Sequence, residues 1–228
     1  MAKEGRKIWM VLGIGCATVL VLGGIVIAIV AYYSYQTAKQ VAETIKNPAE
    51  KTNEVLGTDQ LPPGYYPNFA MEIPFLMEMA IISNKPLDED PNHREMGDHG
   101  FVYMKMIRFG KESEELEGYF RGETQDASVL RKNNINIDVD EELDRGVLEE
   151  EGRLIMYVTQ RGRVNVNHGR KYGLSTIALI RCEGERRVRF AIWYGPESED
   201  LGNLTGSAAD INAFQGFISH FQFCNADG

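Results

Sequence analysis

The sequence has few of the residues and motifs that usually carry chemistry. Its 228 residues include only three cysteines, four histidines and two tryptophans. No Cys-x-x-Cys pair or related spacing accompanies the cysteines, so the usual zinc sites are not indicated. The Gly-x-Ser-x-Gly elbow, the phosphate loop, the dinucleotide fingerprint and the zinc-protease motif are all absent. The sequence therefore indicates no catalytic residue and no cofactor. An enzyme whose active site has no local sequence signature stays an open alternative.

Basic side chains are outnumbered by acidic ones, 24 to 33, and the net charge is −9. A nucleic-acid role is not expected, since binding phosphates requires a positive field. The charge is uneven, however: residues 111–151 carry 14 acidic and 5 basic side chains, and residues 153–189 carry 2 acidic and 9 basic ones. Either the two segments lie close together and partly neutralise each other, or the second forms a basic face for an anionic partner. The first interpretation is favoured, because charge runs are usually solvated faces.

One acidic loop partly imitates a calcium-binding loop. Asp88, Asp90 and Asn92 occupy the spacing of its first three ligands. The sixth position is His93 instead of glycine, and the twelfth is His99 instead of glutamate. No metal site is predicted there, and a solvated loop is the favoured interpretation.

The most informative segment is an apolar run at residues 8–31. Thr18 is its only conventionally polar side chain, and it contains no charge. A run of about 20 apolar residues can cross a bilayer as a helix. A cleaved signal peptide would have a shorter apolar region and a small-x-small cleavage site, and a lipoprotein cysteine would lie later than Cys16. The sequence predicts a retained membrane anchor.

The flanking charges predict the orientation of this anchor. Lys3, Arg6 and Lys7 precede the run, whereas residues 32–38 are neutral and the first following cation is Lys39. Positive flanks favour the cytoplasmic side, so we expect a cytoplasmic N-terminus and an extracytoplasmic C-terminal domain. The expected segments are a cytoplasmic N-terminus at 1–7, a transmembrane signal-anchor at 8–33, a juxtamembrane helix and linker at 34–60, and the domain at 61–228.

The anchor carries small residues along one side of the expected helix. They fall within about 60° of one another at helical spacing: Gly13, Ala17, Gly24, Ala28 and Ala31. Such a stripe allows a second membrane helix to approach closely, either from another copy or from a partner. The alternative is that glycine and alanine are simply common in membrane helices.

Beyond the anchor, four apolar residues recur at helical spacing: Ala38, Val41, Ala42 and Ile45. This pattern predicts that the helix continues to about Asn47, because Pro48 disfavours helix in the residue before it. A short helix is possible at 49–56, and the Pro- and Gly-containing segment at 57–64 places the domain boundary near Leu61.

The domain sequence predicts an α+β fold built on an antiparallel sheet. Strands are expected at residues 69–73, 75–83, 101–109, 154–160, 175–182 and 187–193. Helices are expected at 111–118 and 124–132, turns at 161–163 and 167–169, and a hairpin turn at 183–185. A C-terminal helix after Ser207 is expected to cover one face of the sheet with five apolar side chains: Ile211, Phe214, Phe217, Ile218 and Phe221.

The two cysteines of the domain form a candidate disulfide. Cys182 ends an expected strand and Cys224 follows the C-terminal helix, whereas Cys16 lies in the anchor. An oxidising compartment would allow Cys182 and Cys224 to bond and hold the helix on the sheet. Two unpaired buried thiols remain the alternative.

These features favour a non-enzymatic interaction or assembly module of the cell envelope, held to a lipid bilayer by its anchor. The small-residue stripe adds a possible homo-oligomer or a partner membrane helix. Two alternatives stay open: an anchored envelope hydrolase without a recognisable motif, and a module that binds a small ligand or lipid in a pocket between helix and sheet.

Overall fold

The structure is a computed structural model of the chain. The residues it describes are 32, 35, 48–87, 96–107, 112–133, 135, 137–150, 152–166, 169–197 and 202–224. The chain divides into two compact units, residues 1–43 and 44–228, and the fold below is that of the second unit. The predicted anchor, apart from Tyr32, and its small-residue stripe lie outside the described residues.

Within those residues, no helix combines the length and the apolar character needed to cross a membrane.

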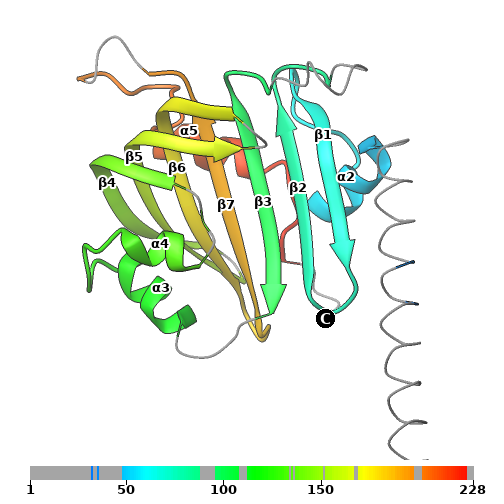
Figure 1. The fold of residues 1–228 in the computed structure, drawn as a ribbon, viewed down its shortest axis with the longest axis horizontal. Helices are drawn as coiled ribbons and strands as arrows, with labels where there is room; N and C mark the ends of the chain where they lie inside the picture. The colour runs from blue at the N-terminus through cyan, green and yellow to red at the C-terminus, as the bar shows by residue number, and fades with distance from the viewer. Residues whose placement is uncertain are drawn as a thin grey trace, which may run out of the picture. The chain divides into compact units, whose positions relative to one another are not determined.

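Seven antiparallel strands form one sheet, in the order β1-β2-β3-β7-β6-β5-β4 (Figure 1). The strands are β1 Tyr66–Ile73, β2 Met77–Ser83, β3 Gly100–Ile107, β4 Ile137–Glu150, β5 Arg153–Val166, β6 Gly169–Cys182 and β7 Arg187–Gly195. The helices are α2 Pro48–Leu56, α3 Glu112–Phe120, α4 Ser128–Lys132 and α5 Ile211–Ile218. The structure confirms the predicted α+β class with an antiparallel sheet.

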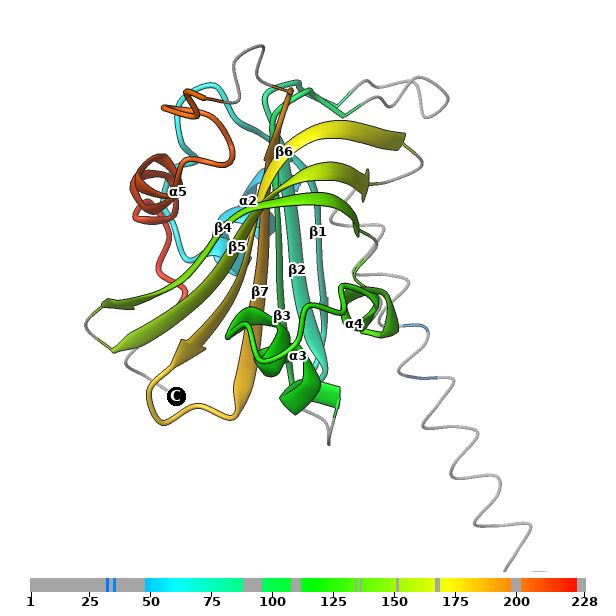
Figure 2. The ribbon, with the colours of Figure 1, turned by 90° about the vertical axis from the view of Figure 1, so that its left-hand side faces the viewer.

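The C-terminal helix α5 packs on one face of the sheet together with α2 (Figure 2). The side chain of Asp210 caps α5 by accepting a hydrogen bond from the backbone of Asn212. Phe217 lies at the centre of an aromatic cluster, with its ring centroid 5.2 Å from that of Phe101 and 5.1 Å from that of Trp193. Because α2 adds the fully buried Leu56 to the same core, the core begins upstream of residue 61.

The helices expected at residues 111–118 and 124–132 are present as α3 and α4, and they form a second layer on the opposite face, a position that the sequence does not predict. There α3 and α4 bury Phe120 and Leu130 against the sheet. Figure 2 shows these two helices on the side away from α2 and α5. Residues 173–180 of β6 are therefore all buried. A strand covered on both faces has no solvent-exposed side, which explains why this stretch carries no charged residue; its polar side chains Ser175 and Thr176 are buried as well.

The acidic residues 137–150, where no strand is predicted, form β4, and the turn expected at residues 161–163 is wrong. Gly162 lies inside β5, where a Cβ atom would come 2.1 Å from the carbonyl oxygen of Asp138 on β4. The glycine marks a close approach of two backbones beside a register shift, which is a usual role of glycine in strands.

The pairing of β4 with β5 also places the acidic segment beside the basic one. Arg161 forms ion pairs with Glu141 on β4 and with Glu197. Arg181 on β6 forms an ion pair with Glu117 on α3. These contacts support mutual neutralisation of the two segments over a separate basic face.

Gly100 is expected to be intolerant of alanine because it faces Tyr194 across β3 and β7. A Cβ atom at residue 100 would lie 2.3 Å from the hydroxyl oxygen of Tyr194, whose side chain is buried. Overpacking of this kind costs about 1–3 kcal/mol, so Gly100→Ala should lower the melting temperature measured by circular dichroism.

The matched control is Gly216→Ala on the exposed side of α5, where an added Cβ meets nothing within 4 Å. It should stabilise the fold by about 0.5–1 kcal/mol, because alanine favours helix over glycine. Equal melting temperatures for the two variants would contradict the proposed clash with Tyr194.

Candidate functional site

Three strands of the sheet carry a surface built largely of methionine. Side chains of β1, β2 and β3 that do not point toward α2 and α5 point to the opposite face. Seven half-buried apolar residues there are called the methionine face: Phe69, Met71, Ile73, Met77, Met79, Met104 and Met106. They include five of the nine methionines of the chain, so methionine is strongly concentrated on this surface.

The strand register places these side chains in rows. Met71 lies opposite Met79, which lies opposite Met104. Ile73 lies opposite Met77, and Met77 opposite Met106, in the same way. Directly opposed side chains in an antiparallel pair are in contact range. The rows therefore form one continuous apolar surface across three strands.

No described helix covers these rows in the view of Figure 1, where α3 and α4 lie over the other half of the sheet. Toward β7 the surface continues into side chains that are buried, including Phe190 and Ile192. The next residues on the same face, Ile81 of β2 and Val102 of β3, are also buried. The methionine face is thus the partly open margin of the second core.

The chemistry available on this surface is limited to apolar contact. Its side chains carry no ionisable group and no strong hydrogen-bond donor. Methionine is unbranched and polarisable, so it adapts to apolar partners of different shape. The surface is suited to binding an apolar segment and has no group for acid–base or nucleophilic catalysis.

The hairpin that joins β1 to β2 ends in an exposed apolar turn. The amide of Leu76 donates to the carbonyl of Ile73 at 2.9 Å, which closes a four-residue turn with Pro74 in second position. Phe75 has φ +67°, and it is the only described non-glycine residue with positive φ. Its side chain is 78% exposed and that of Leu76 is 52% exposed. We call Pro74, Phe75 and Leu76 the hairpin tip.

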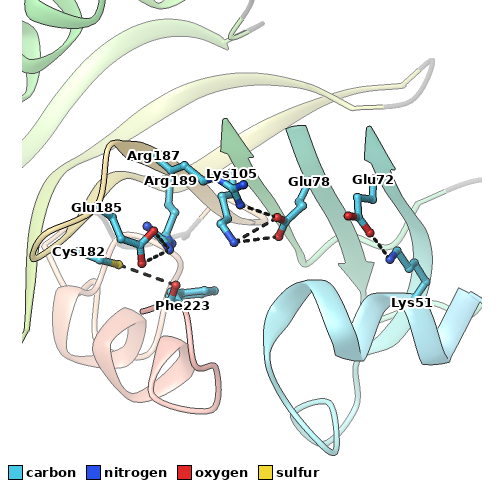
Figure 3. A network of polar contacts seen from close by, with 9 residues as sticks. All are labelled: Lys51, Glu72, Glu78, Lys105, Cys182, Glu185, Arg187, Arg189 and Phe223. Atoms are coloured by element: carbon cyan, nitrogen blue, oxygen red, sulfur yellow. Dashed lines mark hydrogen bonds and ion pairs between the residues drawn. The ribbon is translucent and has the colours of Figure 1, made fainter. Parts of the chain in front are cut away.

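The other face of the same strands carries a row of charges (Figure 3). Glu72 lies opposite Glu78, Glu78 opposite Lys105, and Lys105 opposite Arg189. The repulsion between the two glutamates is offset, because Lys51 of α2 pairs with Glu72 and Lys105 pairs with Glu78.

The remaining contacts complete this charge network. Arg187 donates to Glu78 at 3.1 Å, and Arg189 donates to both carboxylate oxygens of Glu185. Burial acts to lower the pKa of Lys51, but its hydrogen bonds to Glu72 and Glu54 outweigh this effect and the pKa is raised. Each charge drawn in Figure 3 already has a partner of opposite sign, so the network is best explained as structural.

Arg189 is the most deeply buried charge of this network, with 1% of its side chain exposed. It lies beside Tyr103, whose pKa is raised by burial while the neighbouring Arg189 opposes that rise. The tyrosine stays neutral and Arg189 depends on Glu185 for its counter-charge. The ion pair of Arg189 and Glu185 anchors the start of β7 to the turn that precedes it.

Two depressions lie at the end of the sheet where β1 ends and β7 begins. The larger has a volume of about 420 Å³ and is lined by Arg153, Leu154, Arg181 and the 182–185 turn. Its arginines are neutralised, because Arg153 pairs with Glu150 and Arg181 with Glu117. The smaller, of about 200 Å³, lies behind the hairpin tip. Neither depression brings together the nucleophile, base and oxyanion donors that a hydrolase needs.

The structure brings Cys182 and Cys224 together as a disulfide, with their Cα atoms 5.5 Å apart. That separation is usual for bonded cysteines. The bridge joins the end of β6 to the segment after α5, as the sequence predicts. The sulfur of Cys182 also lies 3.8 Å from the carbonyl oxygen of Phe223.

The other residues considered from the sequence form no reactive cluster. Asp88, Asp90, Asn92 and His93 lie outside the described residues. His99 contacts the side chain of Asn84, at 3.4 Å between Nδ1 and Nδ2. In the part of the chain that the structure describes, no group of three or more His, Cys, Asp or Glu side chains could hold a metal.

Sequence reasoning missed the methionine face, although a signal for it exists. Methionine recurs at spacing two in β2, at Met77 and Met79, and again in β3, at Met104 and Met106. Spacing two places both members of a pair on one face of a strand. The strand register needed to join the pairs was not available from the sequence.

No family model matches the chain, and comparisons with curated proteins and with solved structures find no match either.

Proposed function

We propose that the chain is a single-pass membrane protein whose extracytoplasmic domain is a non-enzymatic interaction module. The uncharged run at residues 8–31 supports the anchor, and Lys3, Arg6 and Lys7 before it support a cytoplasmic N-terminus. The Cys182–Cys224 bridge supports an oxidising location for the domain.

The proposed partner is an amphipathic helix of another protein, which would bind to the methionine face. Strands spaced by about 4.8 Å place β1 and β3 about 10 Å apart, which matches the diameter of one helix. Along β1, the distance from Phe69 to Ile73 is about 14 Å, which corresponds to about nine helical residues. A helix bound to this face would contact the rows with apolar side chains at positions i, i+3, i+4 and i+7.

The size of the surface favours a single helix over a second folded domain. The rows span an area of roughly 140 Å², whereas a stable interface between folded proteins takes about 800 Å² from each partner. The adaptable methionine side chains would accept related helices of differing sequence.

Association through the anchor would strengthen this binding. The stripe of Gly13, Ala17, Gly24, Ala28 and Ala31 would bring two or more copies together in the bilayer. Several methionine faces held close together would bind a multivalent partner with increased avidity.

Photo-crosslinking tests the methionine face directly. Cells that incorporate a diazirine methionine analogue into the full-length chain are irradiated, and the crosslinked peptides are identified by mass spectrometry. Adducts of Met79 and Met104 should map to one partner segment with apolar residues at helical spacing. The double variant Met79→Ser, Met104→Ser should lower the yield at the remaining rows by about tenfold, because apolar contact area is lost.

The control is Val147→Ser on β4, which removes an exposed apolar side chain away from the methionine face. It should leave the adducts unchanged. Adducts scattered over unrelated proteins, or an equal yield from the double variant, would show that the methionine face is not a helix-binding site.

A further inference from the structure

The hairpin tip is built at a cost to the fold. In a turn with proline second and positive φ third, the third position favours glycine or asparagine. Here it is Phe75, with φ +67°. A side chain with a Cβ atom is disfavoured in this conformation. Because Phe75 is 78% exposed, the fold gains little from burial of its side chain. Strain at an exposed residue of this kind points to a function outside the fold.

Leu76 extends the apolar tip, with 52% of its side chain exposed. The amide of Ile107 on β3 donates to the carbonyl of Leu76, at 3.4 Å, so the turn is tied to the neighbouring strand. The tip is therefore a fixed projection of two large apolar side chains beyond the ends of β1 and β2.

Charged residues lie at the base of the tip. Glu72, Glu78, Lys105 and Arg187 line the 200 Å³ depression behind it, so its lining carries no net charge. Lys105 and Arg187 pair with the same carboxylate of Glu78, at 3.1 Å in each case. The neighbouring Arg186 is exposed. An exposed apolar projection with an exposed cation nearby suits the boundary between anionic lipid headgroups and acyl chains.

We propose that the hairpin tip inserts Phe75 and Leu76 into the acyl–headgroup boundary of the membrane that holds the anchor. This inference rests on the proposed anchor, because the apolar run at residues 8–31 keeps a lipid surface within reach of the domain. The exposed Arg186 then faces lipid phosphates. The tip supplies a second, weaker contact with the bilayer and limits the orientations of the domain.

The test places p-benzoylphenylalanine at residue 75 of the full-length chain. The protein is reconstituted into vesicles of phosphatidylcholine and phosphatidylglycerol, irradiated, and analysed by mass spectrometry for lipid adducts. The matched control carries the same photoreactive residue in place of Tyr172, an aromatic residue of β6 that is 43% exposed. We expect at least about tenfold more lipid adduct at residue 75 than at residue 172.

The outcomes separate this inference from the proposed anchor. Alkaline carbonate extraction first shows whether the chain is held in the vesicles. Release by carbonate would contradict the anchor and the inference together. Retention with equal lipid adducts at residues 75 and 172, or with protein adducts at residue 75, would overturn the lipid contact alone.

A stability measurement on Phe75→Asn tests whether the ring of Phe75 contributes to folding. Asparagine tolerates positive φ better than phenylalanine, so this variant should melt at the same temperature as the native chain or higher. A lower melting temperature would show that Phe75 serves the fold, and it would overturn the argument from strain.

Discussion

Replacing both Cys182 and Cys224 by serine is expected to lower the free energy of unfolding by about 4 kcal/mol. The cysteines are 42 residues apart in the sequence. Closing a loop of this length restricts the unfolded chain by about that amount in the chain-entropy description. For a domain of this size, the melting temperature should fall by about 8–16 °C.

The segment held by the bridge explains why the loss should be visible in the core. Phe221 and Phe223, just before Cys224, stack on the sheet: their ring centroids lie 5.3 Å from Phe101 and 4.7 Å from Tyr103, respectively. Without the bridge, this segment is held by packing alone. It should become the first part of the domain to open.

The measurement is thermal unfolding of the full-length chain in detergent, followed by the fluorescence of the buried Trp193. Reduction of the native protein should reproduce the effect of the double variant. Cys16→Ser is the control, because Cys16 takes no part in the bridge, and it should melt with the native chain. A double variant as stable as the Cys16 control would show that the bridge contributes nothing.

Glu185→Ala is expected to destabilise the domain by about 3 kcal/mol. Removing this carboxylate leaves the guanidinium of Arg189 buried without a counter-charge, because only 1% of that side chain is exposed. Breaking a buried ion pair from one side costs about 3–5 kcal/mol. The lower end applies here, because 20% of the Glu185 side chain is exposed and water can reach its position. The melting temperature should fall by about 6–12 °C.

Two controls separate this charge effect from damage to the turn. Glu183→Ala removes an exposed carboxylate from the same turn, and it should change stability by less than about 0.5 kcal/mol. The pair Glu185→Gln, Arg189→Met removes both charges and should recover much of the stability lost in Glu185→Ala. If the pair is no more stable than the single variant, the unpaired charge is not the cause of the loss.

The sequence determined those features that depend on neighbouring residues. The helical spacing of Phe214, Phe217 and Ile218 predicts α5, and the acidic residue that caps it is visible three positions after Ser207. The apolar run at residues 8–31 predicts an anchor by its length alone. Pro74 places the break between β1 and β2. Each of these patterns is contained in one short segment of the chain.

The sequence did not determine how many layers cover the sheet or where strand β4 lies. The acidic residues 137–150 have no strong strand propensity, and they form β4 because β5 supplies hydrogen bonds and arginine partners. The local sequence around Gly162 predicts a turn, because the close backbone neighbour of this glycine, Asp138, is distant in the sequence.

Only the tertiary structure decided where the candidate surfaces lie. Met71, Met79 and Met104 come from three strands, and the register of those strands makes them neighbours. The helices α3 and α4 cover the β5 and β6 side of the same face, and this leaves the methionine face partly open. No pattern in the sequence distinguishes Phe75 from other phenylalanines. The turn makes it both strained and exposed. Long-range pairing and packing fix these properties, and neither is encoded in a local pattern.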